Sequence, residues 1–200
     1  MLHIIGVAHH AQSQTRGEDR TECQAKFAKT LHAAISRVHP ILIAEEDSEE
    51  ALCCRNGESI ARQIAGEHVI EHRFCDPTQE QRKAIDYSDD SFSFIQKFSK
   101  EREELSADKL EEIYVRERAT HIARYLAKRE RFWLNHLADH LNDQIIFICG
   151  DFHVETFGDL LQGAGVPFEM IDRGIGLTQS DRRFDRRVRE FLAQHPDLGR

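Results

Sequence analysis

Two short apolar runs near opposite ends of the chain constrain its fold most. Leu2–Ile5 leads into Gly6-Val7-Ala8-His9, and Ile145–Cys149 leads into Gly150-Asp151-Phe152-His153. Short apolar runs that stop at glycine favour strands buried inside a sheet rather than surface helices. Each Gly-x-x-His tetrad therefore marks the expected end of a buried strand.

Amphipathic segments fill the sequence between these two runs. Apolar positions spaced by threes and fours predict helices, and short β-branched or alternating runs predict further strands. The expected helices cover about 17–38, 58–65, 78–85, 106–141, 154–162 and a last segment capped by Ser180; the other expected strands cover about 41–44, 69–75 and 166–170. This order predicts an α/β fold with a mixed, mostly parallel sheet flanked by helices and a helical excursion in the middle of the chain.

Length and composition predict one domain that spans residues 1–200. A chain of 200 residues with 40% apolar content is long enough for one sizeable core. Residues 87–106 are too aromatic for a linker and too polar for core, so we expect a surface excursion or a lid there.

Charge and cysteine usage narrow the class of partner and the compartment. The net charge is −8 and its acidic residues are spread along the chain, which argues against nucleic acid or an anionic membrane as a partner. The five cysteines form no Cys-x-x-Cys pair, and no run approaches the length of a membrane span or a secretion signal. We expect a cytoplasmic protein.

Histidines and carboxylates collect at the predicted strand ends. The carboxyl ends of parallel strands face one crevice, and three predicted strands lead into His9-His10, Glu45-Glu46 and Gly150-Asp151-Phe152-His153. Imidazole and carboxylate groups bind Zn, Mn, Co or Fe, and they also serve as general acids and bases near neutral pH. The sequence predicts a chemically active edge of the sheet.

An arginine interrupts the apolar stripe of the longest predicted helix. Leu126 and Trp133 lie seven residues apart on this stripe, and Arg129 lies three residues beyond the first and four before the second. Residues at these spacings share a helix face. We therefore predict that Arg129 points toward the interior.

Each of these features also has a structural explanation. A histidine at a strand end is often only a hydrogen-bonded loop residue, and an arginine on a helix often bridges to a neighbouring helix. His68-Val69-Ile70-Glu71-His72 matches an inverted zincin motif, but that motif needs a helix and this segment favours a strand. Cys149 lies in an apolar run, where an inert buried thiol is the usual outcome.

The order of these motifs resembles the TraB/TIKI group, within the wider set that includes erythromycin esterase-like and ChaN-like proteins. The segment Ile148–His153 is the most similar part. The resemblance implies metal-dependent hydrolysis by His9, Glu45, Arg129 and His153. Val7 stands where the group usually has threonine, and Glu130 stands where it usually has aspartate or asparagine.

We therefore expect a metal-dependent hydrolase of a peptide, ester or amide bond in a small-molecule or peptide substrate. His9, Glu45 and His153 would bind or flank a divalent metal (Mn, Co, Zn or Fe) that activates water, and Arg129 would hold an anionic group. The residues expected to support them are His10, Glu46, Asp151 and Glu155.

Two alternatives stay open. In a metal-free variant of the same site, one histidine acts as general base and Glu45 orients it. In the other, the chain is not an enzyme but a binding or regulatory module that holds haem, iron or a small ligand in the same crevice, with the aromatic segment 92–98 as a contact surface.

Overall fold

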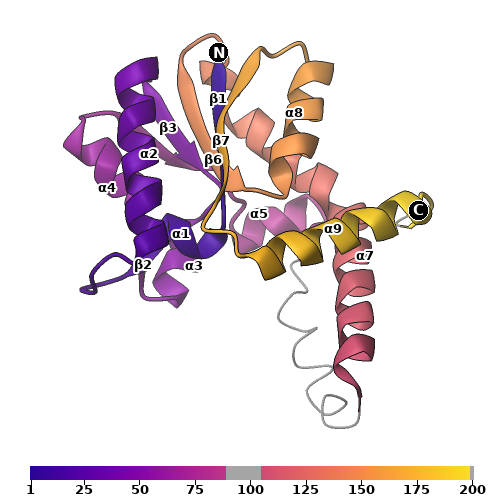
Figure 1. The fold of residues 1–200 in the computed structure, drawn as a ribbon. Coiled ribbons are helices and arrows are strands. Elements are labelled where there is room, and N and C mark those ends of the chain that lie inside the picture. Colours follow the sequence, from indigo (N-terminus) through magenta and orange to yellow (C-terminus); the bar gives the residue numbers. More distant parts are fainter. Residues whose placement is uncertain (89–104, 199–200) are drawn as a thin grey trace. The chain divides into compact units, whose positions relative to one another are not determined.

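The computed structural model describes residues 1–88 and 105–198 (Figure 1). Five strands form one sheet in the order β5-β3-β6-β1-β7, and every neighbouring pair in it is parallel. Their bounds are β1 Leu2–Val7, β3 Leu42–Glu45, β5 Glu71–Phe74, β6 Ile145–Gly150 and β7 Phe168–Ile175. The predicted α/β class is confirmed.

A second, two-stranded antiparallel ribbon joins β2 (Ser13–Thr15) to β4 (Gly57–Ser59). The described helices are α1 His9–Gln12, α2 Glu22–Val38, α3 Glu49–Cys54, α4 Ile60–Glu67, α5 Gln79–Ala84, α7 Ala107–His136, α8 His153–Gly163 and α9 Gln179–Gln194, with a 3-10 turn at Ala138–His140. No membrane-crossing helix occurs in residues 1–88 and 105–198, since none there is both long and apolar enough.

The chain groups into two compact units. The first contains residues 1–78 and 130–177, and the second contains residues 79–129 and 178–200, so α7 contributes to both. The expectation of a single domain stays a prediction. The expected lid or excursion at 87–106 falls almost entirely outside the described residues.

The first unit has helices on both faces of its sheet. Alternate side chains of each strand point to opposite faces. On one face Ile5 and Ile148 pack with Phe27 of α2, and on the other Ile4 and Phe147 pack with the end of α7 and with α8. Strands buried on both faces explain why the short apolar runs lack polar alternation.

The carboxyl ends of β1, β3 and β6 lie side by side. In the pairing of β1 with β6, Val7 lies opposite Gly150, and in the pairing of β3 with β6, Glu45 lies opposite Ile148. The backbone N–H of Glu46 donates to the carbonyl of Ile148 at 2.8 Å. Residues that follow these three strands are therefore held at one edge of the sheet.

Several helix ends differ from those predicted. Ser59 caps α4 by accepting the backbone N–H of Arg62, so the helix begins two residues after Glu58. Thr178, not Ser180, caps α9, because its hydroxyl and the Asp181 carboxylate form a capping box.

The second unit contains a cluster of aromatic rings and ion pairs between α7 and α9. Tyr87 is buried, and its ring packs edge-on against His121 and Tyr125. Arg183 and Arg187 of α9 pair with Glu111 of α7. Two arginines of α9 are therefore engaged in ion pairs within this unit.

Candidate active site

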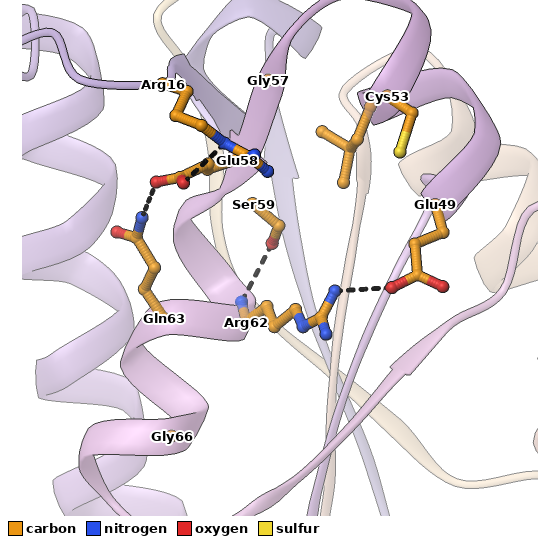
Figure 2. A pocket seen from close by; sticks show the side chains of 10 residues that line it. Arg16, Glu49, Cys53, Gly57, Glu58, Ser59, Arg62, Gln63 and Gly66 are labelled. Atoms are coloured by element: carbon orange, nitrogen blue, oxygen red, sulfur yellow. Dashed lines mark hydrogen bonds and ion pairs between the residues drawn. The ribbon is translucent and has the colours of Figure 1, made fainter.

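A cleft of about 480 Å³ opens beside α3, β4 and α4 in the first unit (Figure 2). Two ion pairs line it: Arg62 Nη1 lies 2.8 Å from Glu49 Oε1, and Arg16 Nε lies 3.0 Å from Glu58 Oε1. These four charges cancel, so together they give the cleft no surplus positive charge to attract an anion. Ser59 forms another part of its lining.

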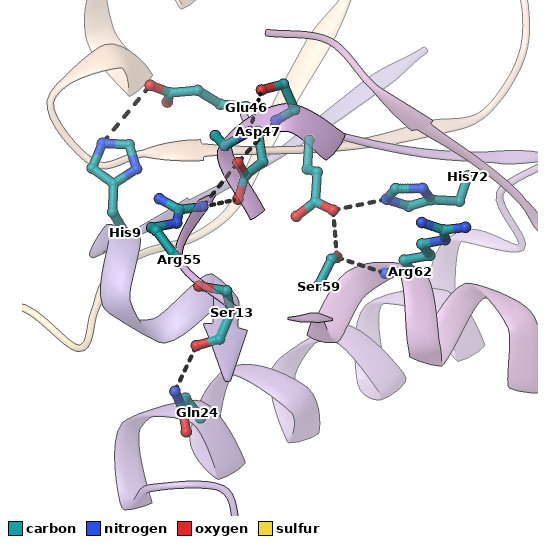
Figure 3. Close-up of polar contacts among 12 residues, drawn as sticks. His9, Ser13, Gln24, Glu46, Asp47, Arg55, Ser59, Arg62 and His72 are labelled. Atoms are coloured by element: carbon teal, nitrogen blue, oxygen red, sulfur yellow. Dashed lines mark hydrogen bonds and ion pairs between the residues drawn. The ribbon is translucent and has the colours of Figure 1, made fainter. Parts of the chain in front are cut away.

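Glu45 lies fully buried behind this cleft. Its Oε1 accepts the Ser59 hydroxyl and lies 2.8 Å from His72 Nε2 (Figure 3). Its other oxygen, Oε2, has no hydrogen-bond partner among the described residues. A buried carboxylate held by a histidine and a hydroxyl joins β3, β4 and β5, and this arrangement fits a structural role.

Glu46, the next residue, lies between the two tetrad histidines. Its Oε1 is 3.8 Å from His9 Nε2 (Figure 3). The same oxygen is 3.4 Å from His153 Nε2, and Oε2 accepts the backbone N–H of Gly150 at 2.6 Å. The carboxylate is fully buried, whereas the side chain of His9 is 55% exposed. One buried carboxylate thus links a buried histidine to an accessible one.

A second buried carboxylate holds His153 from its other side. His153 Nδ1 lies 3.0 Å from Glu130 Oε1, which also accepts the Thr156 hydroxyl. The Trp133 ring covers the imidazole edge-on, with centroids 4.7 Å apart. Because a carboxylate only accepts, the His153 imidazole donates to Glu130, and the neighbouring aromatic ring fixes its orientation.

Each tetrad glycine makes room for the other tetrad. A Cβ on Gly150 would lie 3.1 Å from His9 Nε2, and a Cβ on Gly6 would lie 2.8 Å from Asp151 Oδ1 and 2.6 Å from Val154 Cγ2. Separations below 3.0 Å require the neighbouring atoms to move. The two tetrads therefore fit each other sterically, which explains why both begin with glycine.

Asp151 anchors an arginine that the sequence analysis did not select. Arg173 of β7 donates to Asp151 Oδ2 through Nη2 at 3.1 Å and to Glu155 Oε1 through Nη1 at 2.9 Å. The Gly174 N–H also donates to Asp151 at 2.6 Å. These two carboxylates raise the pKa of Arg173. Asp151 and Glu155 therefore fix the start of α8 to β7.

Asp47, the residue after Glu46, is a buried aspartate whose pKa is raised. Burial raises its pKa to about 6 from an ordinary 3.8, although Arg55 opposes this shift through an ion pair at 2.8 Å. The folded chain therefore binds a proton at Asp47 more tightly than the unfolded chain does. The stabilisation from this proton is complete below about pH 4 and is lost as pH rises through 6.

Replacing Asp47 with asparagine is expected to flatten the pH dependence of stability. Between pH 4 and pH 7 the free energy of unfolding of the parent should fall by about 2–3 kcal/mol more than that of the variant, because asparagine cannot ionise. Urea unfolding at both pH values measures this difference. Glu49→Gln, at an exposed carboxylate, is the control; equal pH dependence in Asp47→Asn and the parent would contradict the assignment.

The structure brings together some of the predicted site residues and separates others. His9 and His153 both face Glu46, and Asp151 and Glu155 both accept from Arg173. The carboxylate between the two histidines is Glu46, while Glu45 faces His72 and Ser59. His10 is exposed on α1.

Arg129 belongs to the second unit. Its guanidinium lies 6.0 Å from the Tyr87 ring centroid. The buried charged residue of this part of α7 is Glu130, which lies four residues after Leu126 and three before Trp133. Both positions satisfy the helical spacing, so the stripe alone did not distinguish them. The proposed role of Arg129 toward an anionic group stays a prediction.

A bound metal ion requires several ligand atoms that converge on one point. Within residues 1–88 and 105–198, no group of three or more His, Cys, Asp or Glu side chains is arranged to hold a metal ion. His68 ends α4 and His72 lies on β5, so the inverted zincin motif does not form one helical face. The mechanism proposed below accordingly uses the side chains alone.

Comparison with protein-family models, curated proteins and solved structures finds no match to this chain. The resemblance to the TraB/TIKI group therefore stays a prediction that rests on the tetrads. The function must be argued from the chemistry of the edge that His9, Glu46 and His153 share.

Proposed function

We propose that the chain is a hydrolase in which His9 acts as general base and Glu46 orients it. The observation that carries this proposal is the position of the buried Glu46 carboxylate between an accessible and a buried histidine. A carboxylate that accepts one imidazole N–H leaves the other ring nitrogen able to take a proton from water. The hydroxide so formed would attack the carbonyl carbon of an ester, amide or peptide bond.

The supporting roles follow from burial and contact. His153 is held by Glu130 on one side and faces Glu46 on the other, so it limits the positions open to the Glu46 carboxylate. The 3.8 Å separation of His9 and Glu46 is long for a hydrogen bond. Catalytic hydrogen bonds often shorten only when substrate binds, so this separation is compatible with the proposed role.

A requirement for metal is a separate part of the proposal. His9, Glu46 and His153 are the ligand-type side chains nearest to one another at this edge, but they are not arranged to hold an ion as they stand. A divalent ion such as Mn, Co, Zn or Fe would require them to move closer together, and it would then lower the pKa of a bound water. Elemental analysis by mass spectrometry of the parent, His9→Ala and His153→Ala decides the matter. Stoichiometric metal that both variants lose would support a metal-dependent site, and its absence after incubation would support the His/Glu mechanism.

Substitution of Glu46 tests the hydrolase itself. Glu46→Gln is expected to lower kcat/KM about 10²- to 10⁴-fold toward a panel of p-nitrophenyl esters and chromogenic amides and peptides, because glutamine orients His9 poorly. His9→Ala should cause a similar loss. Glu50→Gln, an exposed glutamate on α3, is the matched control and should retain activity.

Two results would contradict this proposal. Unchanged turnover in folded His9→Ala would show that His9 is not the general base. A complete lack of hydrolysis by the parent would contradict the assignment as a hydrolase. A haem absorbance band on adding haemin, without hydrolysis, would favour the alternative of a binding module. The aromatic segment 92–98 invoked for that alternative lies outside the described residues.

A further inference from the structure

Two histidines outside the candidate active site face each other on the surface of the first unit. His32 lies on α2 and His68 ends α4, and His32 Nδ1 lies 3.0 Å from His68 Nε2. The ring centroids are 5.2 Å apart and the rings are inclined by 54°. The side chain of His32 is 41% exposed and His68 is exposed, so solvent and ions reach the pair.

This separation matches that of two ligands at right angles around one metal ion. Two nitrogens bound at about 2.1 Å and at about 90° lie about 3.0 Å apart. Square-planar and octahedral ions such as Ni(II) and Cu(II) have this angle, whereas tetrahedral ligands lie farther apart. In the structure the two nitrogens are within hydrogen-bond distance of each other, so a bound ion would replace this hydrogen bond and both rings would turn their lone pairs toward the ion.

A carboxylate lies behind one of the two rings. Glu67 Oε2 is 3.7 Å from His32 Nε2, the nitrogen on the far side of the ring from His68. A metal-binding histidine commonly donates its other N–H to a carboxylate, which fixes the ring and makes the ligand more basic. At 3.7 Å this contact is longer than a hydrogen bond, and a small shift of the Glu67 side chain would close it. Glu67 would then favour the His32 tautomer whose Nδ1 can bind a metal.

We propose that His32 and His68 form a surface site for a Ni(II)- or Cu(II)-type transition metal. Glu67 orients His32, and water occupies the remaining coordination positions. The bound ion would link α2 to α4. This site shares no residue with the His9–Glu46–His153 edge, so it does not depend on the proposed hydrolase function.

Calorimetric titration with Ni(II) tests the proposal, because nickel does not readily oxidise the five thiols of this chain. The parent is expected to bind one equivalent that His32→Ala and His68→Ala both lose, with at least about a tenfold fall in affinity. Glu67→Gln should weaken binding by about tenfold or less. His195→Ala, at the exposed end of α9, is the control and should bind as the parent does.

A second measurement separates this site from the candidate active site. Ni(II) should raise the Tm of the parent by several degrees, because the ion binds the folded state, and it should raise the Tm of His9→Ala equally. It should have little effect on His32→Ala or His68→Ala. Retention of the nickel equivalent in both of these variants, or its loss in His9→Ala, would overturn the proposal.

Discussion

The His153→Ala variant is expected to unfold about 6–20 °C below the parent chain. Removing the imidazole leaves the buried Glu130 carboxylate without the Nδ1–H group that it accepts, and leaving a buried carboxylate unpaired in this way costs about 3–5 kcal/mol. In a chain of this size 1 kcal/mol corresponds to about 2–4 °C. Thermal unfolding followed by circular dichroism measures the effect.

Thr156→Ala is the reference variant for the stability loss expected in His153→Ala. It removes one hydroxyl that donates to Glu130 but leaves His153 in place, so it should cost only about 1 kcal/mol. A double-mutant cycle of His153→Ala with Glu130→Gln should show coupling of at least about 1 kcal/mol. If His153→Ala proved no more harmful than Thr156→Ala, the buried His153–Glu130 pair would not hold the site.

The Gly6→Ala variant is expected to lose about 2–3 kcal/mol of stability, the cost of overfilling a packed interior. The added methyl would lie 2.6 Å from Val154 Cγ2 and 2.8 Å from Asp151 Oδ1. Neither neighbour moves easily, because Val154 is buried and Asp151 is held by Arg173 and the Gly174 N–H. Urea unfolding gives the free energy directly.

Gly66→Ala is the matched control for this substitution. Gly66 lies in α4, and a Cβ there would meet nothing within 4 Å. Alanine should therefore stabilise the chain by about 0.5–1 kcal/mol, since it favours helix over the unfolded state. Opposite signs at the two glycines would support the steric fit of the tetrads, and a neutral Gly6→Ala would contradict it.

The central strands could be predicted from sequence because burial on both faces leaves a simple pattern. Leu2–Ile5 and Ile145–Cys149 have almost no polar side chains, and glycine follows each of them. The pairing of their tetrads followed from the rule that parallel strands end at one edge. The ribbon of β2 with β4 was missed, because three-residue strands are too short to show alternation.

At two positions the structure brings the neighbour of a predicted residue into contact with a tetrad histidine: Glu46 follows Glu45, and Glu130 follows Arg129. The catalytic roles of Glu45 and Arg129 stay predictions. Adjacent residues at a strand end point in different directions, so the sequence did not tell whether Glu45 or Glu46 faces the histidines. On α7 the choice between Arg129 and Glu130 was equally open. Each lies three residues from one of Leu126 and Trp133 and four residues from the other, and both spacings place residues on a shared helix face. Such a choice depends on which buried side chain lies opposite, here His153, and a single sequence does not contain that information.

The position of β1 has a consequence for the order in which this protein acquires its site during synthesis. Both neighbours of β1 in the sheet, β6 and β7, come from residues 145–175, so β1 leaves the ribosome well before either of the strands that it pairs with. Until then His9 has neither Gly150 nor His153 beside it. A nascent chain stopped before residue 145 would expose an apolar segment and carry no assembled site.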